Sequence, residues 1–394
     1  MSGAQRPRRE GRLPCPHFPD CVGCPLIGTA YGEQLARKRD IVRAAFAAYP
    51  SLAHIEVPVV SGSPRAFGYR NQAKLVARRA RRGLLLGVYR PGTHQVVDVG
   101  ACPVHEPGIN RILAGVRRAV DATAVSVYDE RRQNGWLRYV VVRTSRWKRT
   151  AQIILVVRDR AEPGERALVR RLKELRGVGS IVLNLNAGRG NAIFGPTFLP
   201  LTRNAALIER IGDLRLQSHA GAFLQANLGV AGRIYARVLD WAAPQPDDVA
   251  VDLYAGVGAL SLLLAARARR VFGIESSPIA VRDGKANIRL NGFHNVRFLE
   301  GEVAAALPPL RALLERVDLL TLNPPRKGVD EAARAATVAC APSRMVYVSC
   351  NPRTLARDCD WFAARAYRVL KLQPYDLLPQ TEHVECVALL EKGT

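Results

Sequence analysis

Val251-Asp252-Leu253-Tyr254-Ala255-Gly256-Val257-Gly258 is the stretch of this 394-residue sequence that decides its fold class. An apolar strand leads into the stretch, and a helix is predicted to follow over residues 259–267. Two glycines between a strand and a helix let the backbone pass close to a ligand. A dinucleotide-binding loop of the form G-x-G-x-x-G would have a third glycine, but Ser261 stands at that position. The pattern predicts a nucleotide-like ligand at the end of a strand.

The sequence around this loop alternates between strands and helices. A helix is predicted over about 228–241, and helices separate the first five of six predicted strands, which cover 249–254, 271–275, 296–299, 317–322, 344–349 and 385–391. This is the layout of a doubly wound α/β sheet. Glu275 ends the second strand, where a carboxylate suits two vicinal ribose hydroxyls. Both S-adenosylmethionine and NAD carry such hydroxyls.

Two further segments are predicted to lie at the carboxyl edge of the same sheet. Asn323-Pro324-Pro325-Arg326 follows one strand, and Ser349-Cys350-Asn351-Pro352 follows the next. Methyltransferases that act on exocyclic amines carry an aromatic residue after the two prolines, and DNA-type cytosine-C5 enzymes carry a cysteine directly after a proline here. This chain has neither. A single cysteine is more often a small buried hydrophobe, but at a strand end that faces the ligand crevice we interpret Cys350 as a nucleophile.

The remaining sequence predicts three parts. Residues 1–54 form a Cys- and Pro-rich segment followed by a helix over 32–49. Residues 55–220 consist mostly of strands, with a helix around 163–175, which predicts an α+β central domain. Its basic segment Arg78-Arg79-Ala80-Arg81-Arg82 is either a contact to RNA phosphates, which would make this the RNA-binding domain, or a solvated turn. Residues 221–394 form the doubly wound, Rossmann-like domain, which the glycine loop, Glu275 and the Asn-Pro-Pro segment together indicate to be an S-adenosylmethionine-dependent methyltransferase domain.

The charge of the chain indicates a polyanionic partner. Its formal net charge is +24, and neutralising phosphates releases counterions, so RNA or DNA is favoured over a surface that merely uses arginine by default. No run of about 18 apolar residues predicts a membrane span. Met1–Glu10 is basic with no apolar run behind it, so no secretory signal is predicted and we expect a cytoplasmic protein. Nothing in the sequence indicates an obligate protein partner.

The N-terminal cysteines have the spacing of metal ligands. Cys15, Cys21 and Cys24 follow a C-x5-C-x2-C pattern, and Cys102 of the central domain completes a set of four. Four cysteines suit either a zinc ion or an iron–sulfur cluster, and the spacing alone favours zinc. The other cysteines outside position 350 are predicted to be core residues: Cys340, Cys359 and Cys386.

Six motifs, spread over nearly the whole chain, resemble those of the 5-methyluridine RNA methyltransferase family. This family comprises the bacterial 23S rRNA uracil-C5 enzymes and the tRNA T-loop enzyme. The motifs are Phe67-Gly68-Tyr69-Arg70-Asn71-Gln72-Ala73-Lys74, Phe223-Leu224-Gln225-Ala226-Asn227, Asp252–Gly258, Asn323–Gly328, Ser349-Cys350-Asn351-Pro352 and Pro379-Gln380-Thr381-Glu382-His383-Val384-Glu385.

The resemblance implies a role for several residues. Cys350 would be the nucleophile, and Glu385 the base that removes the C5 proton, with Glu382 and His383 as local rivals. The predicted contacts of S-adenosylmethionine are Gln225, Tyr254, Glu275 and Asn323. Two positions depart from part of the family. Ala259 stands where some members have a cofactor-contacting Asn, and Asn323 stands where many have Asp, which removes a charge and leaves a hydrogen-bond acceptor.

The resemblance also decides between the metals and among the functions. The rRNA branch of the family carries a [4Fe–4S] cluster on this cysteine pattern, so Cys15, Cys21, Cys24 and Cys102 are predicted to bind one. We expect methylation of uracil C5 in 23S rRNA, and hence a part in rRNA processing. The alternatives are a tRNA T-loop methyltransferase, a non-catalytic iron–sulfur protein that binds RNA, and an NAD-dependent oxidoreductase.

Overall fold

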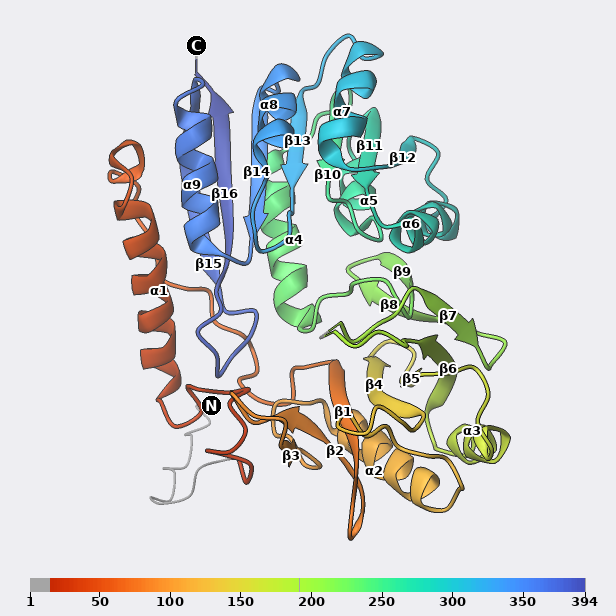
Figure 1. The fold of residues 1–394 in the computed structure, drawn as a ribbon. Coiled ribbons are helices and arrows are strands. Elements are labelled where there is room, and N and C mark those ends of the chain that lie inside the picture. Colours follow the sequence, from red (N-terminus) through yellow and green to blue (C-terminus); the bar gives the residue numbers. More distant parts are fainter. Residues whose placement is uncertain (1–14, 191, 394) are drawn as a thin grey trace, which may run out of the picture.

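The computed structural model describes residues 15–190 and 192–393 (Figure 1). Within this part of the chain the strands form two large sheets and one hairpin. Seven strands in the order β12-β11-β10-β13-β14-β16-β15 form the C-terminal sheet, and seven in the order β3-β2-β1-β4-β5-β6-β7 form the central sheet. The C-terminal sheet carries the motifs on which the ligand site is predicted.

Parallel strands make up most of the C-terminal sheet. Their carboxyl ends meet at one edge, and the antiparallel strand β16 is inserted between β14 and β15. The strands are β10 (Val249–Leu253), β11 (Arg270–Glu275), β12 (Val296–Glu300), β13 (Leu319–Leu322), β14 (Arg344–Ser349), β15 (Tyr367–Tyr375) and β16 (Glu385–Lys392). The six predicted strands are confirmed. Strand β15 was not predicted, because its alternation is broken by a bulge between Val369 and Lys371.

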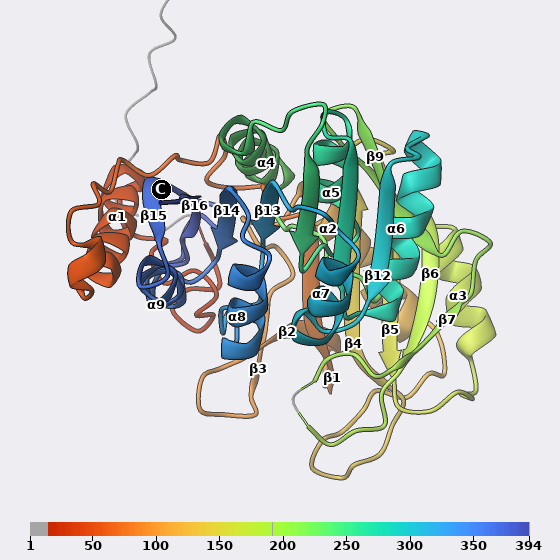
Figure 2. The same ribbon diagram turned by 90° about the horizontal axis from the view of Figure 1, so that it is seen from above.

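Helices cover both faces of this sheet (Figure 2). On one face lie α1 (Tyr31–Ala47), α7 (Val303–Ala312), α8 (Glu331–Ala339) and α9 (Pro352–Ala363), and on the other lie α4 (Leu228–Ala242), α5 (Ala259–Ala265) and α6 (Pro278–Asn291). Helix α1 comes from the predicted segment 1–54, yet its Val42 and Phe46 belong to the core of the C-terminal sheet. None of the described helices is long and apolar enough to cross a membrane.

The central sheet is covered on one face by α2 (Pro107–Asp121) and α3 (Glu165–Lys173). Its strands are β1 (Gln72–Ala80), β2 (Gly83–Tyr89), β3 (Val96–Asp98), β4 (Leu137–Ser145), β5 (Thr150–Val157), β6 (Val178–Leu185) and β7 (Thr197–Pro200). The sequence analysis did not predict α2. Its buried residues Ile109, Leu113, Val116 and Val120 recur at helical spacing behind a proline in the first turn, a signal that was available.

A hairpin bridges the two sheets. Strands β8 (Ala206–Ile211) and β9 (Leu214–His219) lie in the range predicted for the central domain. The backbone N–H of Gln217 donates to Asn287 of α6 at 2.7 Å, whereas the backbone N–H of Arg146 at the end of β4 donates to Glu209 of β8, also at 2.7 Å. The hairpin thus contacts both halves of the molecule. A short 3-10 turn, η1 (Pro50–Leu52), follows α1.

Candidate active site

A cavity of about 910 Å³ lies at the carboxyl edge of the C-terminal sheet, between this sheet and the start of β1. Open α/β sheets bind ligands at this edge. The cavity gathers all the predicted catalytic and cofactor-contacting residues, which come from six separate segments: Gln225, Tyr254, Glu275, Asn323, Cys350 and Glu385. The structure therefore brings together side chains that the sequence analysis could only name individually.

The glycine loop after β10 turns sharply toward this cavity. Tyr254, Gly256 and Gly258 all have left-handed backbone conformations, with φ of 60°, 56° and 90°. A Cβ atom at Gly258 would lie 2.9 Å from the ring of Phe298, so only glycine fits there. Tyr254 has no such freedom, and a non-glycine residue in this conformation is held there by its surroundings. The loop is thus shaped for a ligand that approaches its backbone.

Glu275 fixes the loop through its carboxylate. One oxygen accepts a hydrogen bond from the backbone N–H of Gly256 at 2.9 Å, and the other accepts from the backbone N–H of Ser277 at 2.8 Å. Each carboxylate oxygen has two lone pairs, so Glu275 retains acceptor capacity for a ligand hydroxyl. Its place at the end of β11, beside the glycine loop, is the one that the sequence pattern predicts.

Cys350 and Glu385 face each other because of the register between β14 and β16. These strands pair antiparallel, with Ser349 opposite Cys386. Continuing that register by one residue places Cys350, which follows Ser349, opposite Glu385, which precedes Cys386. Directly opposed residues have Cβ atoms about 4.5–5.5 Å apart. Both side chains line the cavity, and Glu385 is close enough to raise the pKa of the Cys350 thiol. A thiol and a carboxyl group placed in this way can act on neighbouring atoms of one small ring.

Burial shapes the ionisation of this pair. It raises the pKa of the Glu385 carboxyl to about 8, an effect that Arg326 partly offsets. Burial also raises the pKa of the Cys350 thiol, and the nearby Glu385 carboxylate raises it further, whereas Arg326 lowers it. Arg326 is thus the nearby cation that favours both ionised groups. A raised pKa makes Glu385 a stronger base than an exposed carboxylate.

His383 also contacts Arg326. The guanidinium Nη2 contacts both ring nitrogens, Nδ1 at 2.6 Å and Nε2 at 3.0 Å. Burial lowers the pKa of His383, and Arg326 lowers it further. A neutral imidazole beside Arg326 is available as a hydrogen-bond acceptor, whereas Glu385 is the group that faces the thiol.

Helix α9 positions the loop that carries Arg326. Asn351 at the start of the helix donates to the carbonyl of Arg326 at 3.0 Å, and Arg357 donates to the carbonyl of Lys327 at 3.1 Å. The fully buried carboxylate of Asp358 accepts from the backbone N–H of Val329 at 2.9 Å. The sequence analysis missed Asp358, since an acidic residue inside a helix gives no local signal of burial.

Known proteins with similar sequences decide the family. A protein of Geobacter sulfurreducens that is named as an RNA methyltransferase is 41% identical over 379 residues, which are 96% of this chain and 77% of that protein. The family model described as tRNA (uracil-5-)-methyltransferase matches residues 211–393. The chain belongs to the 5-methyluridine RNA methyltransferase family. A similarly named protein of Gloeobacter violaceus is 38% identical, over 96% of this chain and 82% of that protein.

A solved structure of the same kind supports the fold of this methyltransferase. The tRNA (uracil-54, C5)-methyltransferase of Pyrococcus abyssi, in complex with S-adenosyl-L-homocysteine, superimposes with a TM-score of 0.77. It is 25% identical in sequence, and the match covers 94% of this chain and 86% of that one. The predicted family, the Rossmann-like fold and the enzyme class, RNA (uracil-C5-)-methyltransferase, are confirmed. The two alternative functions from other classes, an NAD-dependent oxidoreductase and a non-catalytic iron–sulfur protein that binds RNA, are therefore set aside.

Further residues line the cavity of this methyltransferase without having been assigned a role. Arg70, Lys74 and Phe223 belong to motifs that the sequence analysis quoted, and all three lie in the cavity wall. Phe223 is 71% exposed, which is unusual for a large aromatic side chain. Lys74 lies in the middle of an otherwise largely apolar strand sequence. This pattern could have indicated that its cationic side chain faces a ligand.

Three of the four predicted cluster ligands line the same cavity. Cys21, Cys24 and Cys102 line it, and Cys15 is close enough to add to the pKa shift of Cys24, which burial above all raises to about 12. The four cysteines are free thiols. Among residues 15–190 and 192–393, however, no three Cys, His, Asp or Glu side chains are arranged so that they could hold a metal ion. The iron–sulfur cluster stays a prediction.

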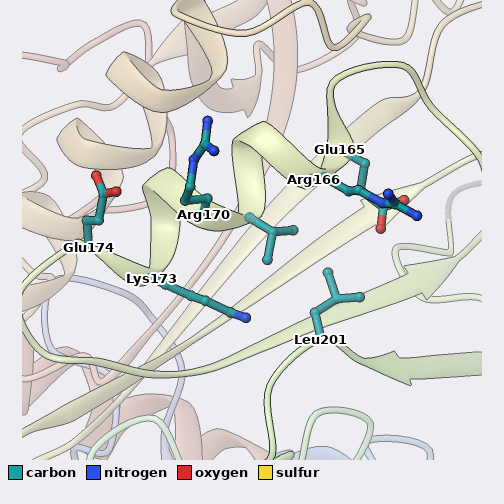
Figure 3. Close-up of a pocket in the computed structure, with 7 residues that line it drawn as sticks. Glu165, Arg166, Arg170, Lys173, Glu174 and Leu201 are labelled. Atoms are coloured by element: carbon teal, nitrogen blue, oxygen red, sulfur yellow. The ribbon is translucent and has the colours of Figure 1, made fainter.

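A second hollow, of about 520 Å³, lies on α3 and the end of β7 (Figure 3). Arg166, Arg170 and Lys173 project from the helix around it, and none of them forms an ion pair with another described residue. Leu201 borders the hollow from β7's carboxyl end. It contains none of the residues predicted to bind a cofactor, a metal or a reacting base.

Proposed function

We propose that this methyltransferase transfers a methyl group from S-adenosylmethionine to C5 of a uracil in 23S rRNA, through a covalent adduct between Cys350 and uracil C6. Cys350 and Glu385 support this function most strongly: they lie at the paired ends of β14 and β16 and line the same cavity as the glycine loop. A protein that only bound RNA would need neither the thiol nor a buried carboxyl group beside it.

Cys350 would solve the central chemical difficulty. Uracil C5 is too weak a nucleophile to take a methyl group directly. Addition of a thiolate at C6 makes C5 enolate-like, so that it can attack an electrophilic carbon. When bound, S-adenosylmethionine supplies that electrophilic methyl group. Arg326 favours the thiolate of Cys350, which burial alone disfavours.

Glu385 would complete the reaction as the base. It removes the proton from C5, and the electron pair of that C–H bond then expels the Cys350 thiolate from C6. Elimination restores the aromatic-like ring and frees the enzyme. The target uracil must leave any base stack to reach Cys350 and the buried Glu385, and the cavity of about 910 Å³ has room for such a base.

Four residues would hold S-adenosylmethionine. The carboxylate of Glu275 would accept hydrogen bonds from the ribose hydroxyls, and Gln225 would contact the methionine part. Tyr254 and Asn323 line the same cavity and would also contact the cofactor. Asn323 retains an acceptor oxygen at a position where many relatives carry a carboxylate, so we expect the contact to persist.

We expect Glu275→Ala to weaken the binding of S-adenosylmethionine by about 1–3 kcal/mol, the cost of a lost hydrogen bond to a charged group. This corresponds to a dissociation constant roughly 5- to 150-fold higher. Isothermal titration calorimetry with the intact protein measures it. Unchanged affinity would remove Glu275 from the cofactor site.

Glu275→Gln separates two effects in the same measurement. The amide keeps an oxygen that can accept from the backbone N–H of Gly256, so the loop stays anchored, but it loses the charge and one acceptor. An intermediate loss of affinity is expected if Glu275 binds the ribose directly. Glu300, an exposed carboxylate on the neighbouring strand β12, offers the matched control Glu300→Ala.

The RNA substrate has two candidates. The N-terminal cysteine pattern, which the resemblance associates with the rRNA branch, favours 23S rRNA. The family model and the Pyrococcus abyssi enzyme are both described with tRNA, which favours a tRNA T-loop. We expect the purified enzyme to label 23S rRNA, and not tRNA, from a strain that lacks its gene. The assay uses methyl-labelled S-adenosylmethionine, with digestion to nucleosides to identify 5-methyluridine.

The four N-terminal cysteines would hold a [4Fe–4S] cluster. Three of these thiols, Cys21, Cys24 and Cys102, come from two distant segments and line one cavity, and Cys15 is near Cys24. Four thiolates are the ligand set that such a cluster takes. The role we propose is structural, because the cluster would tie residues 15–24 to the central domain through Cys102.

Protein purified without oxygen should therefore be brown and contain about four iron atoms per chain. Exposure to air should bleach it, and Cys24→Ser should lower the iron content. Cys340→Ser changes a buried core thiol away from this wall and should keep the iron. Colourless, fully active protein with one bound zinc would contradict the iron–sulfur assignment and leave the four-cysteine site in place.

A further inference from the structure

The loop between β15 and β16 carries the proposed base at its end. Residues 376–384 have no regular structure, and Glu385 follows them directly. Groups from four other parts of the molecule donate hydrogen bonds to four consecutive carbonyls of this loop, at 3.0–3.1 Å: Asn227 to Leu377, Lys38 to Leu378, Tyr69 to Pro379 and the backbone N–H of Leu26 to Gln380. The loop is held from outside at every one of these positions.

Gln34 of α1 contacts both this loop and the segment that follows the N-terminal cysteines. It is only 1% exposed. Its amide nitrogen donates to the side-chain oxygen of Gln380 at 3.0 Å, and its amide oxygen accepts from the backbone N–H of Gln380 at 3.0 Å. The same nitrogen contacts the carbonyls of Leu26 at 3.1 Å and Thr29 at 2.9 Å. Gln34 thus joins the cysteine segment, α1 and the loop.

Gln380 is held in a conformation that it would not adopt alone. Its φ is 69°, in the left-handed region, and the side chain is 2% exposed. A non-glycine residue keeps such a conformation only where surrounding contacts require it. A second anchor lies at the start of the loop. There the buried carboxylate of Asp376 pairs with Lys38 and accepts a hydrogen bond from the hydroxyl of Tyr31 at 2.7 Å. Both anchors belong to α1, which lies beside β15 and α9 (Figures 1 and 2).

We infer that Gln34 is a positioning residue for the base: through Gln380 it transmits the placement of the cysteine segment to Glu385. The inference rests on the proposed function, in which Glu385 acts only after methyl transfer. Cys350 directly follows β14, whose place is set by its pairing with β13 and β16 and not by a contact with Gln34. Release of the loop should therefore slow elimination and leave the attack of Cys350 on the RNA unchanged.

A merely structural role predicts a different pattern. If Gln34 only stabilises the fold, its loss lowers the melting temperature, and the formation and release of the adduct decline together. A positioning role separates the two steps, because a small displacement of a catalytic group can slow its own step by about 10- to 100-fold while the others proceed. The covalent RNA adduct then accumulates on a folded enzyme.

The test compares Gln34→Ala with Glu33→Ala, its exposed neighbour on the same helix, in the intact protein with 23S rRNA from a strain that lacks the gene. Denaturing electrophoresis of labelled RNA follows the formation and release of the adduct. For Gln34→Ala we expect the adduct to form at the rate of the unmodified protein and to be released about 10- to 100-fold more slowly. For Glu33→Ala we expect both rates to equal those of the unmodified protein. Amide hydrogen exchange should become faster at Leu26 and Gln380.

A second variant covers the case in which Gln34→Ala does not fold. Gln380→Gly removes the side chain that Gln34 holds, and glycine suits the left-handed backbone. It should show the same stalled adduct. Glu385→Gln serves as the reference variant that traps RNA. If Gln34→Ala and Gln380→Gly both fold and release the adduct as fast as the unmodified protein, the positioning role is overturned and the proposed function still stands. Absence of any adduct in Glu385→Gln would overturn the proposed base, and the inference with it.

Discussion

Cys350→Ala is expected to lower methyl transfer below detection and to abolish every covalent link to RNA. The cavity lining includes no other thiol at a strand end, since Cys21 and Cys24 belong to the N-terminal segment and Cys102 lies in the central domain outside any helix or strand. Loss of a nucleophile costs on the order of 10⁶ in kcat in a well-studied covalent enzyme. The assay measures 5-methyluridine formed in RNA over time, together with gel-shifted adduct under denaturing conditions.

The matched control is Cys359→Ala. Cys359 is a fully buried thiol on α9 that belongs to the core between this helix and the sheet, and it does not line the cavity. Its loss should cost stability through a small void, roughly 1 kcal/mol, and leave the chemistry intact. S-adenosylmethionine should still bind to Cys350→Ala. Continued synthesis of 5-methyluridine by Cys350→Ala would refute the covalent mechanism as a whole.

Glu385→Gln should fail at a later step. The amide keeps the shape of the side chain but cannot accept the C5 proton. Attack by Cys350 and methyl transfer can proceed, and elimination should stall with methylated RNA bound to the enzyme. We expect a stoichiometric adduct that survives denaturing electrophoresis, after no more than one turnover per enzyme.

The melting temperature of Glu385→Gln shows whether this variant is folded as stably as the unmodified protein. The folded-state pKa of Glu385 is raised from 4.5 to about 8, so the stability associated with the protonated carboxyl is complete below about 4.5 and is lost as pH rises through 8. Glutamine cannot ionise. At pH 8–9 the melting temperature of Glu385→Gln should thus be no lower than that of the parent. Normal turnover without a trapped adduct would assign the base elsewhere, with His383 or a water molecule next.

The sequence by itself determined the C-terminal sheet and the edge at which ligands bind. Strands such as β10 and β14 are short apolar runs, and the residues that follow them, Gly256 and Cys350, stand where chemistry concentrates in a parallel sheet. These signals are local, because period and turn residues depend only on neighbours in the chain. The family motifs are local in the same sense, so their residues could be named before any contact was known.

Only the tertiary structure decided which residues meet. Glu385 faces Cys350 because β16 inserts antiparallel between β14 and β15, and β15 itself escaped prediction. Lys38 and Gln34 sit on a helix where the sequence suggests solvent, yet both are buried against a loop near the other end of the chain. Strand register and the burial of polar groups depend on partners that are distant in sequence, and no local pattern specifies those partners.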